Sequence, residues 1–361
     1  MTTNAQDLSA SLHGLRVHVV DPAAYTPPYD RGLASALARA GADVELWTSA
    51  FRYGDVPPAP GVEVVEHFYR RGSGKLARVG SHVPDMLSYR REARAADVVH
   101  FQWLSIQALD ARLLPARRPR LLTAHDVLPR EPRPGQLKGQ KALYERMDAI
   151  VVHSEHGAAR LRDELGLDPA LVHVIPHGAL TGLDVPGAAP FAKPGKPVVL
   201  FFGLIRPYKG VDVLLEAWAQ ANPEAELWVV GMPRMDTAFI HGRNVRTALR
   251  FVSGAELAGA FRAADLVVLP YREIDQSGVL FTALAFGKPI LATSVGGFPE
   301  VGAAELVPPG DPEALAEALT RVLQPAELER LAAASRAAAE GEYGWDAIAR
   351  RTLALYEALQ A

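Results

Sequence analysis

Short apolar runs alternate with helix-forming stretches along almost the whole chain, and this alternation constrains the fold more than any other feature. Strand candidates in the first half are Arg16–Val20, Val44–Thr48, Val62–Glu66, Val98–Phe101, Leu121–Ala124, Ile150–His153 and Val172–Ile175; those in the second half are Val198–Phe202, Leu227–Val230, Val245–Leu249, Leu266–Leu269, Ile290–Thr293 and Glu305–Val307. Helical stretches such as Arg31–Ala40 and Glu155–Leu165 separate them. Since nearly continuous apolar strands are typical of strands buried on both faces, the pattern predicts parallel sheets covered by helices.

The alternation stops between Thr181 and Pro197, where four prolines interrupt the chain, and then resumes. Proline cannot continue a helix or a sheet ladder, so this segment is predicted to be a linker. A chain of 361 residues is also too long for one typical core. We therefore predict an α/β protein with two Rossmann-like, doubly wound parallel-sheet domains, 1–180 and 198–341, facing a cleft. We predict that residues 342–361 are a separate C-terminal segment, with a final helix that starts at Trp345.

Composition excludes several classes of protein. The chain is 49% hydrophobic and 22% charged, which fits a soluble globular protein. A net charge of −3 argues against a nucleic-acid partner, and zero cysteines exclude disulfides and thiolate metal sites. Met1–Ser11 lacks the features of a signal peptide, and no apolar run reaches the roughly 18 residues of a membrane span, so a cytoplasmic location is expected.

Basic residues gather in one part of the first half, at Arg70, Arg71, Lys75, Arg78, Arg90, Arg91 and Arg94. A solvated face is the simpler interpretation of such a group. The alternative is contact with anionic lipid, which would place the protein peripherally at the inner membrane face.

The segment from Phe201 to Gly210 predicts an anion site. A buried strand stops at Gly203, two cations follow at Arg206 and Lys209, and a helix is predicted from Val211. Arginine offers a planar fork of donors and lysine a compact charge, and the amides of a helix N-terminus add partial positive charge. Ligands of open α/β sheets bind beyond the carboxyl ends of strands, so this turn predicts a phosphate-bearing ligand.

A second candidate is the segment Asp275–Leu280, which follows the strand Leu266–Leu269. Ser277 is a favourable N-cap, and Gly278 lets a ligand approach the backbone closely. Leu280, Ala283, Leu284 and Gly287 share the helical spacing of a buried face. The helix N-terminus suits another phosphate, or the other side of the same diphosphate.

The third candidate is His125, just beyond the strand Leu121–Ala124. Its ring can hydrogen-bond a sugar hydroxyl or a phosphate, and Asp126 could orient it. His177 follows another strand, and we interpret it as part of the turn between the domains.

Missing motifs set other functions aside. The chain has no Asp-x-Asp, so a divalent-metal site of that type on a sugar nucleotide is not expected, and we predict no metal. It also lacks His-Glu-x-x-His, Gly-x-Ser-x-Gly, and a Gly-x-Gly-x-x-Gly after the first strand. Zinc proteases, serine hydrolases and dinucleotide oxidoreductases are therefore disfavoured.

Taken in order, these motifs resemble glycosyltransferase family 4, whose members have the GT-B architecture. The resemblance covers nearly the whole chain. It includes Gly203-x-Ile205-Arg206-x-x-Lys209-Gly210, the run from Gln276 to Pro289, Val295–Glu300, His125, Pro176-His177-Gly178 and the Trp345-Asp346 helix.

The resemblance implies a retaining transferase, a hexosyltransferase of this family, that uses a nucleotide-diphosphate sugar such as a UDP- or GDP-sugar and requires no cofactor. Arg206 and Lys209 would hold the diphosphate, His125 would line the sugar pocket, and the last helix would pack on the first domain. The acceptor would be a sugar or another hydroxyl, including a lipid-linked one. The implied donor-binding residues are Gly203, Arg206, Lys209, Gly231, Val252, Gln276, Ser277, Gly278, Val279 and Thr282.

The chain departs from the family pattern at two places. The paired glutamates of the family correspond to Ile274 and Thr282, so we expect Glu273 to orient the donor sugar and the Thr282 hydroxyl to contact the ribose. The first loop has Tyr25-Thr26-Pro27-Pro28-Tyr29 where members often have two glycines. This predicts an aromatic acceptor wall formed by Tyr25 and Tyr29, with Asp126 on the same side.

Two other functions fit the same architecture. A sugar-nucleotide epimerase would consume the donor without an acceptor. A non-catalytic sugar-nucleotide-binding protein would bind the nucleotide but show no turnover with any acceptor.

Overall fold

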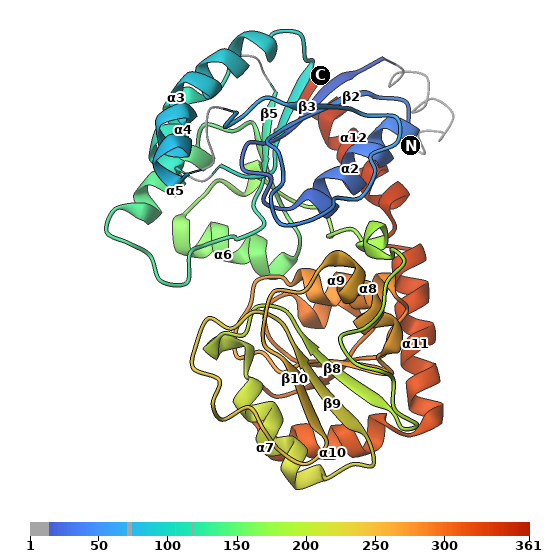
Figure 1. Cartoon of the computed structure of the whole chain (residues 1–361). Helices are drawn as coiled ribbons and strands as arrows, with labels where there is room; N and C mark the ends of the chain where they lie inside the picture. Colours follow the sequence, from blue (N-terminus) through green and yellow to red (C-terminus); the bar gives the residue numbers. More distant parts are fainter. Residues whose placement is uncertain (1–13, 71–73, 105, 117–118) are drawn as a thin grey trace. The chain divides into compact units, whose positions relative to one another are not determined.

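The computed structural model describes residues 14–70, 74–104, 106–116 and 119–361. The expectations for Met1–Ser11 and Arg71 therefore lie outside the described residues. The chain divides into two compact units, one formed by 1–178 with 345–361 and the other by 179–344 (Figure 1).

The first unit contains a seven-stranded parallel sheet with the order β3-β2-β1-β4-β5-β6-β7. Its strands are β1 (Arg16–Asp21), β2 (Asp43–Thr48), β3 (Glu63–Glu66), β4 (Val98–Phe101), β5 (Arg120–Thr123), β6 (Ala149–Val152) and β7 (Val172–Val174). Its helices are α2 (Pro27–Arg39), α3 (Lys75–Glu92), α4 (Gln107–Leu113), α5 (Gln136–Tyr144), α6 (Glu155–Leu165), η1 (Pro169–Leu171) and α12 (Trp345–Gln360). Helices α3, α4 and α5 lie on one side of the sheet, and α2 and α12 lie on the other (Figure 1). Successive strands are added in one direction across the sheet from β1 to β3 and in the other from β4 to β7, so the switch point of this sheet lies between β1 and β4.

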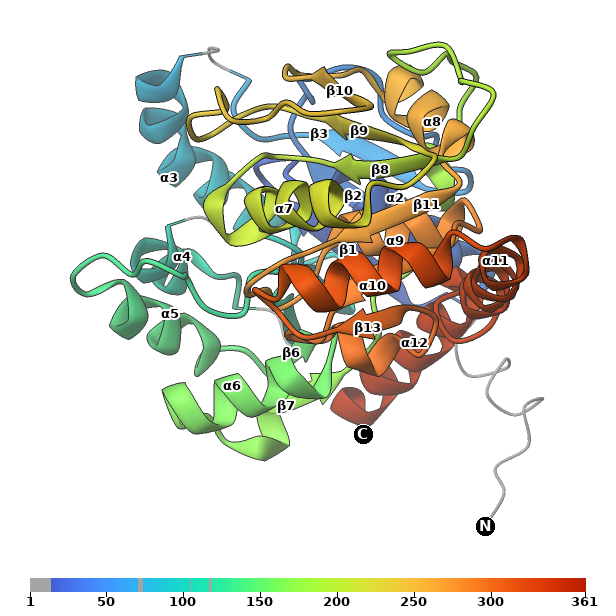
Figure 2. The same cartoon turned by 90° about the horizontal axis from the view of Figure 1, so that it is seen from below.

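The second unit contains a six-stranded parallel sheet with the order β10-β9-β8-β11-β12-β13. Its strands are β8 (Val198–Phe202), β9 (Glu226–Val230), β10 (Val245–Ala248), β11 (Leu266–Leu269), β12 (Ile290–Thr293) and β13 (Glu305–Val307). Its helices are η2 (Thr181–Leu183), η3 (Pro207–Lys209), α7 (Val211–Ala221), α8 (Gly254–Ala263), α9 (Gly278–Ala285), η4 (Phe298–Val301), α10 (Pro312–Val322) and α11 (Pro325–Glu340). Helices α7 and α10 pack side by side on one face of this sheet (Figure 2). Its switch point lies between β8 and β11.

The α/β class and the two parallel sheets are confirmed, and every expected strand has a counterpart within a residue or so of the expected bounds. Helix α2 begins at Pro27, earlier than expected, because proline is favourable in the first turn, where no intrahelical amide bond is lost. Helix α9 ends at Ala285, so Gly287 is not part of its buried face. With a φ of 59°, Gly287 ends the helix instead, and its amide and that of Lys288 bond back to Leu284 and Ala283.

The proline-rich segment after Thr181 packs on α8 within the second unit. Arg262 of α8 donates to the Asp184 carboxylate at 2.6 Å and to the Gly187 carbonyl at 2.7 Å. A Cβ on Gly187 would lie 2.3 Å from the Ala255 carbonyl oxygen, which shows how closely the two backbones approach. The segment is therefore anchored along a helix rather than suspended between domains.

Helix α12 belongs to the first unit and packs on α2. Its first residue, Trp345, lies against Gly32 and Gly178, where added Cβ atoms would come within 2.4 Å and 2.6 Å of the indole ring. Two glycines thus make the space for this side chain. Among the described residues, no helix combines the length and the apolar character that crossing a bilayer would require.

Candidate functional site

In the second unit, most of the residues expected to bind the donor gather where β8 and β11 end. Gly203 follows β8 directly, Arg206 and Lys209 lie in the turn after it, and Ser277 precedes α9 in the connection after β11. Because β8 and β11 are neighbours across the switch point, the cationic turn and the N-terminus of α9 converge at the sheet edge where ligands of such folds bind.

Lys209 is the most informative side chain of this edge. It is only 6% exposed, and its ammonium lies 4.8 Å from the centre of the Tyr271 ring. Within the described part of the chain, neither Lys209 nor the exposed Arg206 has a carboxylate partner. Burying a cation without a counter-ion costs free energy, and an aromatic face compensates for only part of it. The arrangement suits an incoming anion.

The backbone beside Lys209 is unusually close-packed. A Cβ on Gly203 would lie 3.0 Å from Lys209 Nζ and 3.4 Å from the Val279 side chain, and Gly203 has a φ of 111°. Gly231, after β9, has a φ of 144°, and a Cβ there would lie 1.9 Å from the Gly203 carbonyl oxygen. Glycine is required at both positions, and the resulting surface leaves Lys209 Nζ beside bare main chain.

The N-terminus of α9 forms the other side of this edge. Ser277 is buried at its N-cap position, but its side chain makes no capping hydrogen bond; its hydroxyl lies 3.5 Å from the Tyr271 hydroxyl. The first amides of α9 therefore have no side-chain cap, and they carry the partial positive charge that attracts anions. Gln276 is close by, and its Oε1 accepts from the Ser277 amide at 3.3 Å.

Other expected donor contacts fit less directly. The Thr282 hydroxyl donates to the Gly278 carbonyl at 2.7 Å within α9 and is 4% exposed, so its proton is not available to a ribose. Glu273 is exposed after β11, whereas Asp275 in the same connection is buried. Val252 is half-buried beyond β10. Asp275 opens the candidate segment Asp275–Leu280, but the sequence predicts no role of its own for it.

In the first unit, His125 lies two residues beyond β5 and lines a cavity of about 230 Å³ together with Tyr25, Trp103 and Asp126. The rings of Trp103 and His125 are stacked, with centroids 5.2 Å apart and planes 11° apart. Tyr25 is 64% exposed and packs on Trp103 at 4.3 Å. Tyr25 and Trp103 therefore form an aromatic wall beside His125, a surface on which a sugar ring can pack.

The wall is built differently from the expectation, because Tyr29 is 3% exposed inside α2 and does not contribute an open face. Trp103, which the sequence did not single out, supplies the ring instead. The hydrogen-bond partners of the His125 ring also differ from the expectation that Asp126 orients it. Its two nitrogens lie 3.2 Å from Gln102 Oε1 and 3.2 Å from His153 Nε2, so its orientation does not depend on Asp126.

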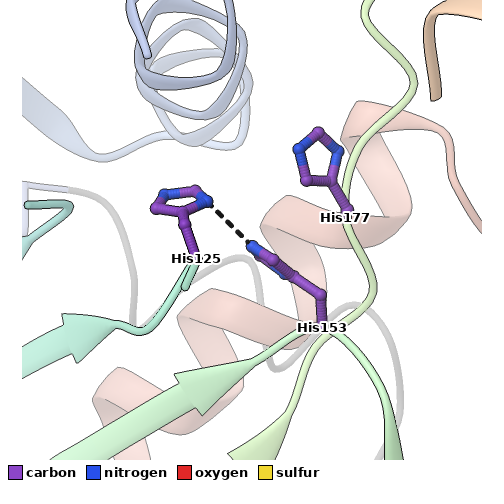
Figure 3. Close-up of side chains that lie close together, drawn as sticks. All are labelled: His125, His153 and His177. Carbon is purple, nitrogen blue, oxygen red and sulfur yellow. Dashed lines mark hydrogen bonds between the residues drawn. The ribbon is translucent and has the colours of Figure 1, made fainter. Parts of the chain in front are cut away.

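Three histidines meet at the carboxyl ends of the neighbouring strands β5, β6 and β7 (Figure 3). His153 follows β6 directly, His177 follows β7, and one ring nitrogen from each histidine lies within 4.8 Å of the others. Burial lowers the pKa of His153 to about 4 and lowers the pKa values of His125 and His177 well below the usual range. His177 is therefore part of this cluster and not only a turn between domains.

The chain matches two family patterns, which together cover most of its length. The family described as Glycosyltransferase Family 4 matches residues 13–181, and the family described as Glycosyl transferases group 1 matches residues 196–325.

Named relatives agree with these matches. The D-inositol 3-phosphate glycosyltransferase of Segniliparus rotundus is 32% identical over 383 residues, covering 91% of this chain and 83% of the relative. A GDP-mannose:glycolipid 4-beta-D-mannosyltransferase of Xanthomonas campestris pv. campestris is 29% identical over 248 residues, covering 60% of this chain and 68% of the relative.

Solved structures share the fold. Sucrose-phosphate synthase from Thermosynechococcus elongatus superposes with a TM-score of 0.73 at 23% identity, covering 96% of this chain and 99% of that one. HepE from Anabaena, solved with UDP and glucose, superposes with a TM-score of 0.72 at 19% identity, covering 96% of this chain and 100% of HepE.

Proposed function

This chain belongs to glycosyltransferase family 4, and from that membership we propose that it transfers a sugar from a nucleotide-diphosphate sugar to an acceptor hydroxyl with retention of the anomeric configuration. The main support for a diphosphate-containing donor is Lys209, a buried cation beside bare backbone at the β8/β11 switch point. A diphosphate supplies the counter-charge that this residue lacks among the described side chains. The Xanthomonas relative is named for GDP-mannose and HepE was solved with UDP, so a UDP- or GDP-sugar is the proposed donor.

The difficult step is the breaking of the bond between the anomeric carbon and the diphosphate. Negative charge grows on the leaving oxygens while the sugar becomes oxocarbenium-like. Arg206, Lys209 and the first amides of α9 are donors held in place before the reaction, and such donors stabilise charge that develops in the transition state. With these groups in place, we propose that the diphosphate needs no divalent cation. We propose that His125 lines the sugar pocket, and that Glu273 orients the donor sugar in place of the family glutamate that corresponds to Ile274.

The acceptor is assigned to the first unit. The cavity lined by Tyr25, Trp103 and Asp126 offers an aromatic face and a carboxylate, which suit a sugar ring and its hydroxyl groups. The Xanthomonas relative is named for a glycolipid, and a lipid-linked acceptor would agree with the exposed Arg70, Arg91 and Arg94. We therefore propose an acceptor that carries a sugar or another free hydroxyl, with peripheral membrane contact when that acceptor is lipid-linked.

The test begins with donor binding. UDP and GDP are titrated into the full chain by calorimetry, and Lys209→Met and Arg206→Ala are compared with Arg330→Ala, an exposed control whose side chain pairs with Glu327. We expect one nucleotide to bind the wild type and the control, and both site variants to bind it more weakly. Equal binding by all four proteins would remove the proposed diphosphate site.

The second stage measures transfer from the donor that binds. Loss of one such donor typically lowers kcat by about 10²–10³-fold, so we expect a decrease of that order in either site variant. Added Mg²⁺ or Mn²⁺ should not raise the rate, and NMR of the product should show the donor's anomeric configuration. Donor conversion to an epimer without acceptor would instead favour the epimerase, and binding without any turnover would favour the non-catalytic protein.

A further inference from the structure

The three histidines at the ends of β5, β6 and β7 share one pattern of outer hydrogen bonds. Nδ1 of His153 lies 3.0 Å from the Ile175 carbonyl oxygen, and Nδ1 of His177 lies 2.7 Å from the Gly178 carbonyl oxygen. A carbonyl oxygen can only accept, so both Nδ1 atoms carry the proton. In the neutral rings, the lone pair of each histidine is therefore on Nε2.

His125 completes the pattern with a side-chain acceptor. Its Nε2 lies 3.2 Å from Gln102 Oε1, so with this amide orientation Nε2 carries the proton and Nδ1 carries the lone pair. That Nδ1 faces His153 Nε2 at 3.2 Å (Figure 3). Two lone pairs cannot hydrogen-bond one another, so this pair requires either a positive centre between the rings or a rotated Gln102 amide.

We propose that His125 Nδ1, His153 Nε2 and His177 Nε2 bind one divalent transition-metal ion, with Zn²⁺ as the best-fitting metal. Three imidazoles without a carboxylate suit zinc rather than calcium or magnesium, which take oxygen ligands. In metal sites the outer nitrogen of each histidine donates to a carbonyl or carboxylate, and here all three outer nitrogens have an oxygen partner.

The distances fit a site that closes slightly on binding. Zinc–nitrogen bonds of about 2.0–2.1 Å place tetrahedral ligand atoms roughly 3.4 Å apart. The His125–His153 pair is already at 3.2 Å, and the third nitrogen lies within 4.8 Å. His177 belongs to the chain segment after β7, outside any helix or strand, so this residue is the one that would move inward.

Tyr29 covers the cluster without adding charge to it, because burial raises the pKa of its hydroxyl. The ring of Tyr29 packs against all three imidazoles, with centroid distances of 4.6 Å to His125, 5.4 Å to His153 and 4.8 Å to His177. An ion bound here would join the ends of three strands and fix the ring of His125, which also lines the cavity with Trp103. Its role would be to position His125, and it is separate from the diphosphate site of the second unit.

The direct test measures metal content in the full chain, expressed without a histidine tag. The protein is treated with a chelator, loaded with ZnCl₂ and desalted. Its bound zinc per chain is then measured by inductively coupled plasma mass spectrometry. We expect about one equivalent of zinc in the wild type and less than about 0.1 in His153→Gln and His177→Gln, because structural metal affinity depends on each ligand. His156→Gln changes an exposed histidine three residues from His153 and should keep the full equivalent.

A second variant protects the test against misfolding. Gln102→Leu keeps all three ligands but removes the oxygen that accepts from His125, and we expect it to lower zinc affinity about 10–100-fold in a calorimetric titration. Co²⁺ in place of Zn²⁺ should give the visible absorption of a four-coordinate site in the wild type. Less than about 0.1 equivalent in the wild type, or unchanged affinity in both His177→Gln and Gln102→Leu, would overturn the site and leave a rotated Gln102 amide as the explanation.

Discussion

The ammonium of Lys209 lies over the ring of Tyr271, 4.8 Å from its centre, and both side chains are buried at the end of β11 and the turn after β8. The ring face holds the cation in position by cation–π attraction while leaving its remaining donors for a ligand. The ring face and the hydroxyl of Tyr271 therefore have different partners. The face contacts Lys209, and the hydroxyl lies 3.5 Å from the Ser277 hydroxyl.

Replacing Tyr271 by leucine should therefore weaken nucleotide-diphosphate binding, while Tyr271→Phe should change it little. A cation–π contact of about 0.5–2 kcal/mol corresponds to roughly 2- to 30-fold in affinity. Calorimetric titration of UDP or GDP measures the difference, and thermal unfolding identifies any general loss of structure in the leucine variant. If the phenylalanine variant binds as poorly as the leucine variant, the hydroxyl and not the ring face is what matters.

A matched pair of glycines tests the packing of α12 on the first unit. Gly32 in α2 lies against Trp345, and an added Cβ would come within 2.4 Å of its ring, whereas a Cβ on Gly80 in α3 would meet nothing within 4 Å. Gly32→Ala should lower the free energy of unfolding by about 1–3 kcal/mol through overpacking. Gly80→Ala should raise it by about 0.5–1 kcal/mol, because alanine favours the helix. Urea unfolding measures both, and shifts in the same direction would contradict this account.

The sequence predicted the two sheets well because each strand is a short, nearly continuous apolar run, such as Val198–Phe202, whose period and length leave few alternatives. The Gly203–Lys209 turn was equally predictable, since strand end, glycine, cations and helix all follow within one short segment. Both features depend only on residues that are neighbours in the sequence.

The histidine cluster could not be predicted in the same way. His153 directly follows the apolar run Ala149–Val152 and gives a local signal, but its meeting with His125 and His177 depends on β5, β6 and β7 being neighbours. Tyr29 was misplaced for a similar reason, because the early start of α2 at Pro27 turns that side chain into the core. Such positions depend on tertiary packing, which overrides local pattern.

The ion pair of Arg272 and Asp212 should position the cationic turn. Arg272 follows β11 and makes two bonds to the Asp212 carboxylate of α7, at 2.9 Å and 2.6 Å, and one to the Pro207 carbonyl at 2.8 Å. Its guanidinium, which bonds and neutralises the carboxylate, holds the pKa of Asp212 below the usual range. The pair thus connects the two sides of the switch point next to Lys209.

Arg272→Lys cannot make the two-pronged contact, so it should reduce nucleotide affinity about 2- to 10-fold while changing stability by less than about 1 kcal/mol. Asp212→Asn should show the same effect, and the double variant should be no worse than either single one. Additive losses in the double variant, measured by the same titration, would show that the two residues act independently.

The stability of the first unit should fall with acidification through His18. This residue is 2% exposed in β1, with its Nδ1 3.3 Å from the Tyr89 hydroxyl and its Nε2 3.3 Å from Glu45. Burial lowers its pKa from 6.5 to about 4, the charge of Glu92 opposes that shift, and Arg16 adds to it.

Between these values the unfolded chain binds more protons at this position than the folded chain, so stability rises with pH in that window. The contribution is fully present above pH 6.5 and is lost as the pH falls toward 4. His18→Gln, which carries no titrating group, should flatten the dependence of the unfolding midpoint on pH in this range. His241→Gln, at an exposed position of the second unit, should leave the slope unchanged, and a wild-type slope in His18→Gln would show that other groups account for the acid sensitivity.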